Sequence, residues 1–122
     1  MKPGLKGFAR WFPAFQNSMN GFKAAYKYEA AFREETLLAL ISLPLAIYFG
    51  ESAIEIILLW GSVLSLLIVE LLNSAVETVV DRVGEEYHEL SGRAKDIASA
   101  AVLLAIFVII FTWAMILIPK YL

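Results

Sequence analysis

The fold is decided by residues 56–82, whose sequence is IILLWGSVLSLLIVELLNSAVETVVDR. The positions up to 69 are uncharged, and Glu70 follows them without a break. Glu77 comes nearly two helical turns later, so both carboxylates project from one helix face, about 10 Å apart along the axis, with Asn73 between them. An uncompensated carboxylate at membrane depth costs on the order of a few kcal/mol, so this row of acids predicts partners or a function.

The rest of the chain fits a membrane protein. Apolar residues make up 60% of its 122 residues, and they form long blocks at 36–49, 56–69 and 97–119 rather than scattered positions. The chain has no cysteine, which excludes disulfides, thiolate catalysis and cysteine-based metal sites. No nucleic-acid partner is expected.

The lengths of these blocks set the expected spans. Crossing about 30 Å of hydrocarbon takes about 20 helical residues, so only the last block is long enough alone. The first span must begin earlier, and the second must continue past Glu70. We predict an all-α membrane protein in which a single domain covers 1–122, with spans at about 30–49, 53–83 and 92–119.

An amphipathic segment precedes the first span. Its bulky side chains recur at helical spacing, at Phe8, Trp11, Phe12, Phe15, Met19, Phe22 and Tyr26. We predict a helix over about 6–27 that lies on the membrane surface; packing of the same stripe on partner helices is the alternative. Pro13 either kinks this helix or lies in its first turn.

The basic residues predict the orientation. The connection 50–55 has none, whereas six precede the first span and three lie between the second and third: Lys2, Lys6, Arg10, Lys23, Lys27 and Arg33, then Arg82, Arg93 and Lys95. By the positive-inside rule the N-terminus and the second connection are cytoplasmic. The acids of the row lie toward that side.

The connections suggest how the helices pack. We expect the second helix to begin near Ser52, Gly84 to end it, and Ser91 to cap the third. The short link makes the second and third helices antiparallel neighbours. Because three helices are too few to shield a polar site from lipid on all sides, we predict a homo-oligomer.

The polar residues indicate a chemistry. Carboxylates with few imidazoles favour Mg²⁺, which usually keeps a nucleotide phosphate as a ligand. The start of the third helix, with Lys95 one turn inside it, suits a phosphate. In such a site Glu70 could accept a proton from a lipid hydroxyl, while Glu77 and an acid of the first helix hold the metal. The same geometry would also fit a non-enzymatic oligomer that conducts cations.

A resemblance to a known family favours phosphoryl transfer over cation conduction. ELLNSAVETVVDR at 70–82 and EYHELSGRAKD at 86–96, with EAAFR at 29–33, closely resemble the signature of the prokaryotic integral-membrane diacylglycerol kinases. The resemblance implies a homotrimer in the bacterial inner membrane, with active sites at subunit interfaces. It implies transfer of the γ-phosphate of ATP to diacylglycerol, giving phosphatidic acid. Undecaprenol kinase, an activity of relatives of this family, is the alternative.

The resemblance also implies roles for individual residues. Glu70 would be the general base, and Glu29 and Glu77 would bind Mg²⁺. The residues expected to contact ATP are Arg10, Asn17, Glu29, Glu77, Glu86, Tyr87, His88, Lys95 and Asp96, and those expected on the lipid side are Glu70, Asn73 and Ser99. Asn17 departs from the family, which has an aromatic residue there, so a stacking contact to the nucleotide base is in question.

Several of these polar residues have structural alternatives. Glu29 could pair with Arg33 one turn later, as an interfacial salt bridge. We expect Glu34 and Glu35 to solvate the start of the first span, without catalytic roles. Surface, capping or packing roles are also open to Asp81, His88, Trp60 and Trp113, and for Asp81 the structural role is preferred.

Overall fold

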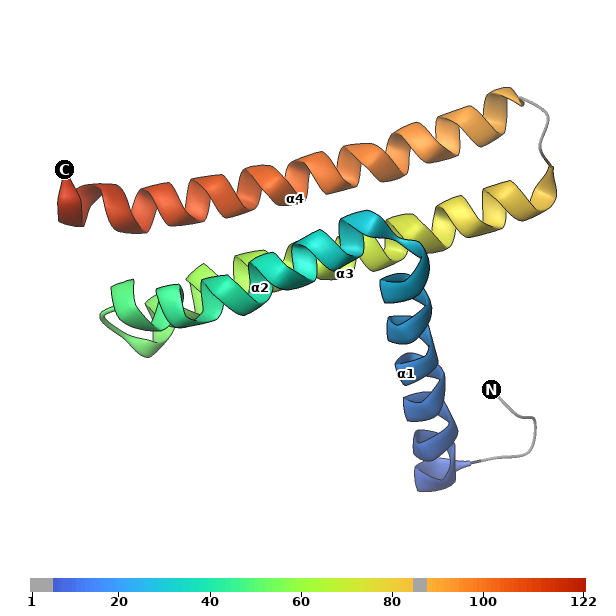
Figure 1. Cartoon of the computed structure of the whole chain (residues 1–122), viewed down its shortest axis with the longest axis horizontal. Coiled ribbons are helices and arrows are strands. Elements are labelled where there is room, and N and C mark those ends of the chain that lie inside the picture. The colour runs from blue at the N-terminus through green and yellow to red at the C-terminus, as the bar shows by residue number, and fades with distance from the viewer. Residues whose placement is uncertain (1–5, 85–87) are drawn as a thin grey trace.

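The computed structural model describes residues 6–84 and 88–122. A short 3₁₀ turn, η1 (Gly7–Arg10), leads into four helices: α1 (Trp11–Tyr28), α2 (Ala30–Phe49), α3 (Ala53–Val83) and α4 (Glu89–Tyr121). Helices α2, α3 and α4 run side by side, and α1 projects away from them where α2 begins (Figure 1). The described residues contain no strand, so the predicted all-α class is confirmed.

The ends of α1 and α3 follow from local sequence. Pro13 is the third residue of α1, in the first turn, where its missing N–H leaves no helical bond unmade; the first-turn alternative is therefore the correct one. At the start of α3, the Ser52 hydroxyl accepts the Glu55 N–H at 3.2 Å, as an N-cap should. Helix α3 ends at Val83, directly before Gly84.

The start of α4 differs from the prediction. Helix α4 begins at Glu89, and His88 is its N-cap, with Nδ1 accepting the Leu90 N–H at 3.0 Å. The expectation that Ser91 caps this helix is therefore wrong. The imidazole supplies the acceptor three residues earlier, which extends the helix toward the second connection.

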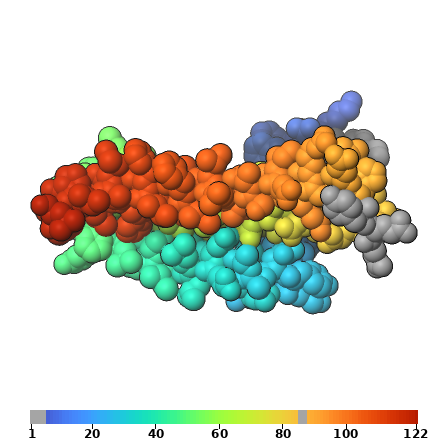
Figure 2. Space-filling view, turned by 90° about the horizontal axis from the view of Figure 1, so that it is seen from above, coloured from blue at the N-terminus to red at the C-terminus, as the bar shows by residue number. Residues whose placement is uncertain are grey.

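Helix α3 is the centre of the bundle, because it packs against both α2 and α4. Its buried residues recur at helical spacing: Leu59, Ser62, Val63, Leu66, Glu70 and Ser74. Helix α2 meets it with Phe32, Ala39, Ser42 and Ala46. By contrast, α4 buries only Ala105 and is exposed along its length (Figure 2).

Two indoles cross-link the bundle. Trp60 of α3 donates from Nε1 to the Ala39 carbonyl of α2 at 2.9 Å. Trp113 of α4 donates to the Leu59 carbonyl of α3 at 3.0 Å. Both side chains are partly buried, so packing between helices accounts for these two tryptophans.

One chain leaves much apolar surface uncovered. Its accessible area is 9162 Å², whereas a soluble monomer of this mass exposes about 6,600 Å². Helices α3 and α4 are long and apolar enough to cross a membrane. In α2 the first turns carry Arg33, Glu34 and Glu35, and its apolar run starts only at 37, so a third span remains a prediction.

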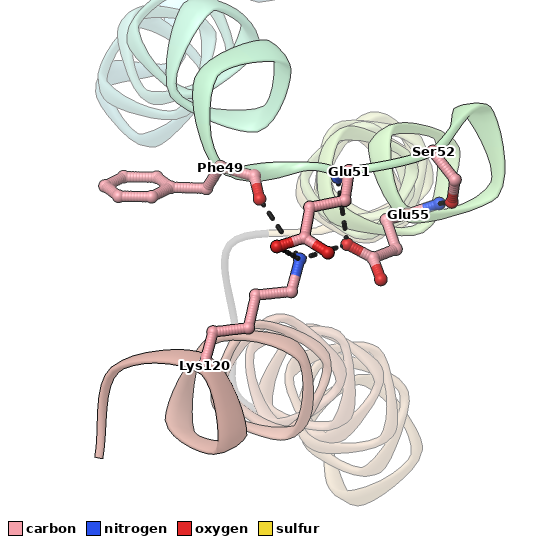
Figure 3. Close-up of polar contacts among 5 residues, drawn as sticks. All are labelled: Phe49, Glu51, Ser52, Glu55 and Lys120. Atoms are coloured by element: carbon pink, nitrogen blue, oxygen red, sulfur yellow. Dashed lines mark hydrogen bonds and ion pairs between the residues drawn. The ribbon is translucent and has the colours of Figure 1, made fainter.

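A polar cluster closes the end of the bundle opposite α1 (Figure 3). Lys120 Nζ donates to the Phe49 carbonyl at 3.2 Å and forms an ion pair with Glu55, while Glu51 Oε1 lies 3.7 Å away. The Glu51 N–H also donates to Glu55 at 3.1 Å. Lys120 thereby ties the end of α4 to the α2–α3 turn. The turn itself requires Gly50, since a Cβ there would lie 2.7 Å from a carbonyl oxygen of α2.

Lys120→Met is expected to lower the midpoint of SDS-induced unfolding in detergent. The change leaves the Glu55 carboxylate without its cation in a partly buried site, where the Lys120 side chain is only 17% exposed. Glu51→Gln is the matched control, because Glu51 is 74% exposed and its pair is long, and such pairs contribute little. Equal effects of the two changes would show that Lys120 does not hold the bundle end together.

Candidate active site

The row of acids predicted on one helix face lies on α3, and an amide joins its members. The Asn73 Nδ2 group donates to Glu70 Oε2 and to Glu77 Oε1, both at 3.3 Å. Glu70 is only 5% exposed. Because the two carboxylates both require donors, they fix which way the amide points. The opposite atom, Asn73 Oδ1, is buried and has no hydrogen-bond partner among the described residues.

Glu29 reaches this row from the junction of α1 and α2. It is the single residue between the two helices, with an extended backbone (φ −115°, ψ 108°). It lines a cavity of about 550 Å³ together with Ser74 and Thr78 of α3. Its charge and that of Glu77 both act on Glu70. The fold therefore gathers Glu29, Glu70 and Glu77, which we call the acid cluster.

The structural alternative for Glu29 is wrong. Arg33 forms no ion pair with it; the guanidinium instead donates from Nη1 to the carbonyls of Tyr26 at 2.7 Å and Lys27 at 3.1 Å. Glu29 is extended and precedes α2 rather than lying within it, and the Arg33 guanidinium is bound by the carbonyls at the end of α1 instead. The Glu29 carboxylate has no ion pair with any described residue.

The donors of the acid cluster suit Mg²⁺. Within 6–84 and 88–122, no three His, Cys, Asp or Glu residues lie close enough to hold a metal by themselves. Mg²⁺ commonly takes only one or two carboxylates and completes its shell with water and substrate phosphate. Glu29 and Glu77 supply carboxylate oxygens of this hard type, and the cluster contains no soft ligand.

The first turns of α4 supply a basic residue whose charge reaches the acid cluster. Lys95 Nζ lies 2.8 Å from Asp81 Oδ1 on α3, an ion pair consistent with the structural role preferred for Asp81. The charge of Lys95 also interacts with Glu77. Asp96 and Ser99 follow on α4, and both are exposed. Lys95 is the seventh residue of α4, nearly two turns inside the helix rather than the one turn expected, and its cation, whose charge reaches Glu77, favours a phosphate there.

Among the described residues, two other predicted nucleotide contacts lie along or before α1. Arg10 and Asn17 lie roughly 28 Å and 18 Å of helix rise before Glu29, and α1 leads away from α3 and α4 (Figure 1). His88 is near the start of α4 but uses Nδ1 to cap it. Glu86 and Tyr87 lie outside the described residues.

Sequence reasoning missed Glu35. Contrary to expectation it does not simply solvate the start of α2: it is half-buried, and its Oε2 atom is buried without a hydrogen-bond partner among the described residues. The charge that acts on it most strongly is that of Glu70. The helical spacing could have predicted this position. Residue 35 lies on the same face of α2 as the buried residues 32, 39, 42 and 46, which face α3.

A groove between α3 and α4 borders the row of acids on α3. It holds about 440 Å³ between α3 and α4, is lined almost entirely by apolar groups, and includes Asn73, Ala98 and Ala101. Asn73 is therefore shared between the acid row and an apolar groove. An alkyl chain could lie in this groove while a hydroxyl group at its end reaches the acids.

The sequence is similar to those of known proteins. Residues 16–117 match the profile of the family described as prokaryotic diacylglycerol kinase. The chain is 51% identical over 117 residues to a diacylglycerol kinase of Escherichia coli, with 96% of each chain covered. It is 56% identical over 100 residues to that of Haemophilus influenzae, covering 82% of this chain and 85% of the relative. A diacylglycerol kinase of Helicobacter pylori is 40% identical over 124 residues, with 98% and 94% covered.

Proposed function

The chain belongs to the prokaryotic diacylglycerol kinase family and is therefore an ATP-dependent kinase, and we propose that it phosphorylates diacylglycerol to phosphatidic acid. The observation that carries this proposal is the buried carboxylate of Glu70, which the Asn73 amide links to Glu77. Asn73 borders an apolar groove, and the charge of Glu77 interacts with that of Lys95 on α4. A lipid alcohol and a phosphate donor can meet between them.

Glu70 is the proposed general base. The lipid hydroxyl oxygen attacks the γ-phosphorus of ATP, the bond to the β–γ bridging oxygen breaks, and ADP leaves with that electron pair. The hydroxyl proton passes to the Glu70 carboxylate. Asn73 orients the base through its amide, and its unpartnered Oδ1 is available to a donor on the lipid side. Ser99 follows the groove residue Ala98 and would contribute a second polar contact there.

Glu29 and Glu77 are the proposed Mg²⁺ ligands. When bound, the ion would neutralise charge on the β- and γ-phosphates. Lys95 and Asp96, with His88, Glu86 and Tyr87 before them, would contact the nucleotide at the start of α4. Support comes from the charge interaction between Lys95 and Glu77.

The site would be completed by a neighbouring subunit. We propose a homotrimer in the bacterial inner membrane, with three spans, a cytoplasmic N-terminus and α1 on the membrane surface, as a single domain over 1–122. Two observations support it: the large apolar surface of one chain, and the distance of Arg10 and Asn17 from the acid cluster along α1. A neighbour's α1 would bring these two side chains to the nucleotide.

An assay with purified protein in mixed micelles tests the proposal. Radiolabelled ATP is supplied with diacylglycerol or with undecaprenol, and the labelled lipid is measured. We expect faster labelling of diacylglycerol. Faster labelling of undecaprenol would favour the related activity. Cation flux in liposomes without any labelled lipid would instead favour a conducting oligomer.

The groove between α3 and α4 gives a sharper test of the lipid side. Ala101→Phe is expected to raise the KM for diacylglycerol roughly tenfold, a cost of about 1.4 kcal/mol, because the ring fills space meant for an alkyl chain. The KM for ATP should not change. Ala100→Phe is the matched control, since Ala100 is exposed and does not line the groove. Equal effects of the two changes would argue against lipid binding there.

A further inference from the structure

The junction that carries Glu29 is built from very few residues. Helix α1 ends at Tyr28 and α2 begins at Ala30, so Glu29 alone makes the turn. Its backbone serves both helices: the Glu29 N–H donates to Ala25 at 2.9 Å, and its carbonyl accepts from the Arg33 N–H at 3.3 Å. The direction in which α1 leaves α2 therefore determines where the Glu29 carboxylate lies.

Little apolar packing holds that direction. Ala25 is the only buried residue of α1, and α1 extends away from the bundle (Figure 1). Most of its bulky side chains are exposed, among them Phe12, Phe15 and Phe22. A polar tie at the junction consequently matters more here than it would in a packed core.

Arg33 provides such a tie. Its guanidinium donates from Nη1 to the carbonyls of Tyr26 at 2.7 Å and Lys27 at 3.1 Å. These carbonyls belong to the last turn of α1, where no following helical N–H is available to them. In the described part of the chain, no other side-chain hydrogen bond joins α1 to α2. A cation at this position also interacts favourably with the C-terminal end of the helix dipole.

We propose that Arg33 is a positioning residue for Glu29: by capping α1 from the first turn of α2, it fixes the junction and holds the Glu29 carboxylate at the acid cluster. Glu29 lies there beside Ser74 and Thr78 of α3, and its charge acts on Glu70. The proposal rests on the proposed function only for the assignment of Glu29 to the metal.

The geometry of the junction can be measured without turnover. The chain has no cysteine, so Asn20→Cys and Leu40→Cys introduce one spin-label pair, on exposed positions of α1 and α2, and dilution with unlabelled chains isolates distances within one protomer. Arg33→Ala is expected to broaden the distance distribution. Arg33→Lys should restore it in part, because an ammonium can reach a carbonyl but lacks the planar fork of a guanidinium.

Metal binding gives the second readout. With Mn²⁺ as the probe and a non-hydrolysable ATP analogue, Arg33→Ala is expected to weaken Mn²⁺ binding about tenfold, as loss of a residue that orients a ligand does. In the kinase assay, the KM for metal-ATP should rise far more than kcat falls. For Arg33→Lys, the Mn²⁺ affinity and the KM for metal-ATP should both lie between the wild-type values and those of Arg33→Ala.

Lys27→Ala is the matched control. It removes a positive charge from the same junction, but the Lys27 ammonium lies over the Tyr28 ring at 5.1 Å, and the Lys27 carbonyl stays in place for Arg33. Lys27→Ala should leave the spin-label distances and Mn²⁺ binding unchanged.

The proposal is overturned if Arg33→Ala keeps the wild-type distance distribution and Mn²⁺ affinity, or if Lys27→Ala has the same effects as Arg33→Ala. If Arg33→Ala does not fold, Arg33→Lys with wild-type values in both measurements also overturns it. The spin-label distances and the Mn²⁺ affinity are both measured without the lipid. These two measurements therefore decide the role of Arg33 even if the acceptor is not diacylglycerol.

Discussion

Glu70→Gln is expected to lower kcat by about 10²- to 10⁴-fold, the range that a general base contributes. Glutamine has the shape of the native side chain and can still accept from Asn73 Nδ2, so the geometry of α3 is kept while the proton acceptor is lost. The KM for ATP should change little, because Glu70 is not assigned to the metal. Initial rates of lipid labelling at saturating substrates measure the effect.

Glu34→Gln is the matched control for this change, since it converts an exposed carboxylate of α2 to an amide without touching the acid cluster. Size-exclusion chromatography in detergent should give the wild-type elution volume for both variants. If Glu70→Gln keeps more than about a tenth of the wild-type kcat, the proton passes to some other group, and Glu70 is not the base.

The predictions that held depend on local periodicity. Residues three, four and seven apart share a helix face whatever surrounds them, so the alignment of Glu70, Asn73 and Glu77 could be inferred before any packing was known. The same holds for the start of α3 near Ser52 and for its end before Gly84, because signals that begin or break a helix act within one turn. The series at 32, 39, 42 and 46 would also have identified Glu35.

The features that sequence did not predict depend on contacts between distant segments. Lys120 meets the Phe49 carbonyl across 71 positions, and no local rule pairs them. Glu29, one turn before Arg33, was the partner that local spacing predicted, but the guanidinium instead binds the carbonyls at the end of α1, across the junction between the two helices. His88 displaced Ser91 as the cap because an imidazole acceptor occurred earlier in the chain.

The position of α1 explains why the nucleotide site is harder to predict than the acid row. Arg10 lies just before α1 and Asn17 in its first half, and α1 projects away from the bundle (Figure 1), so no pattern within one chain can say which cluster they serve. The acids lie on α3 and at the junction, and within one chain Asn73 already links Glu70 to Glu77 while Glu29 lines a cavity beside α3. Division of the site between subunits would account for this difference.

Glu77→Gln is expected to raise the Mg²⁺ concentration for half-maximal rate at least tenfold, because loss of a residue that merely orients a ligand already costs 10- to 100-fold in affinity. The amide keeps an oxygen near Asn73 but removes the charge that attracts the ion. Asp81→Asn is the control from the same helix, where Lys95 holds the carboxylate at 2.8 Å and a metal role is not expected.

Excess metal separates a ligand from a base. Raising Mg²⁺ well above the wild-type requirement should recover part of the rate of Glu77→Gln, since a weakened site still fills by mass action. The same addition should recover nothing in Glu70→Gln, whose site already binds the ion and lacks only the proton acceptor. If excess Mg²⁺ restored both variants equally, the two acids would share one role, and the division into a base near the lipid and a ligand near the nucleotide would be wrong.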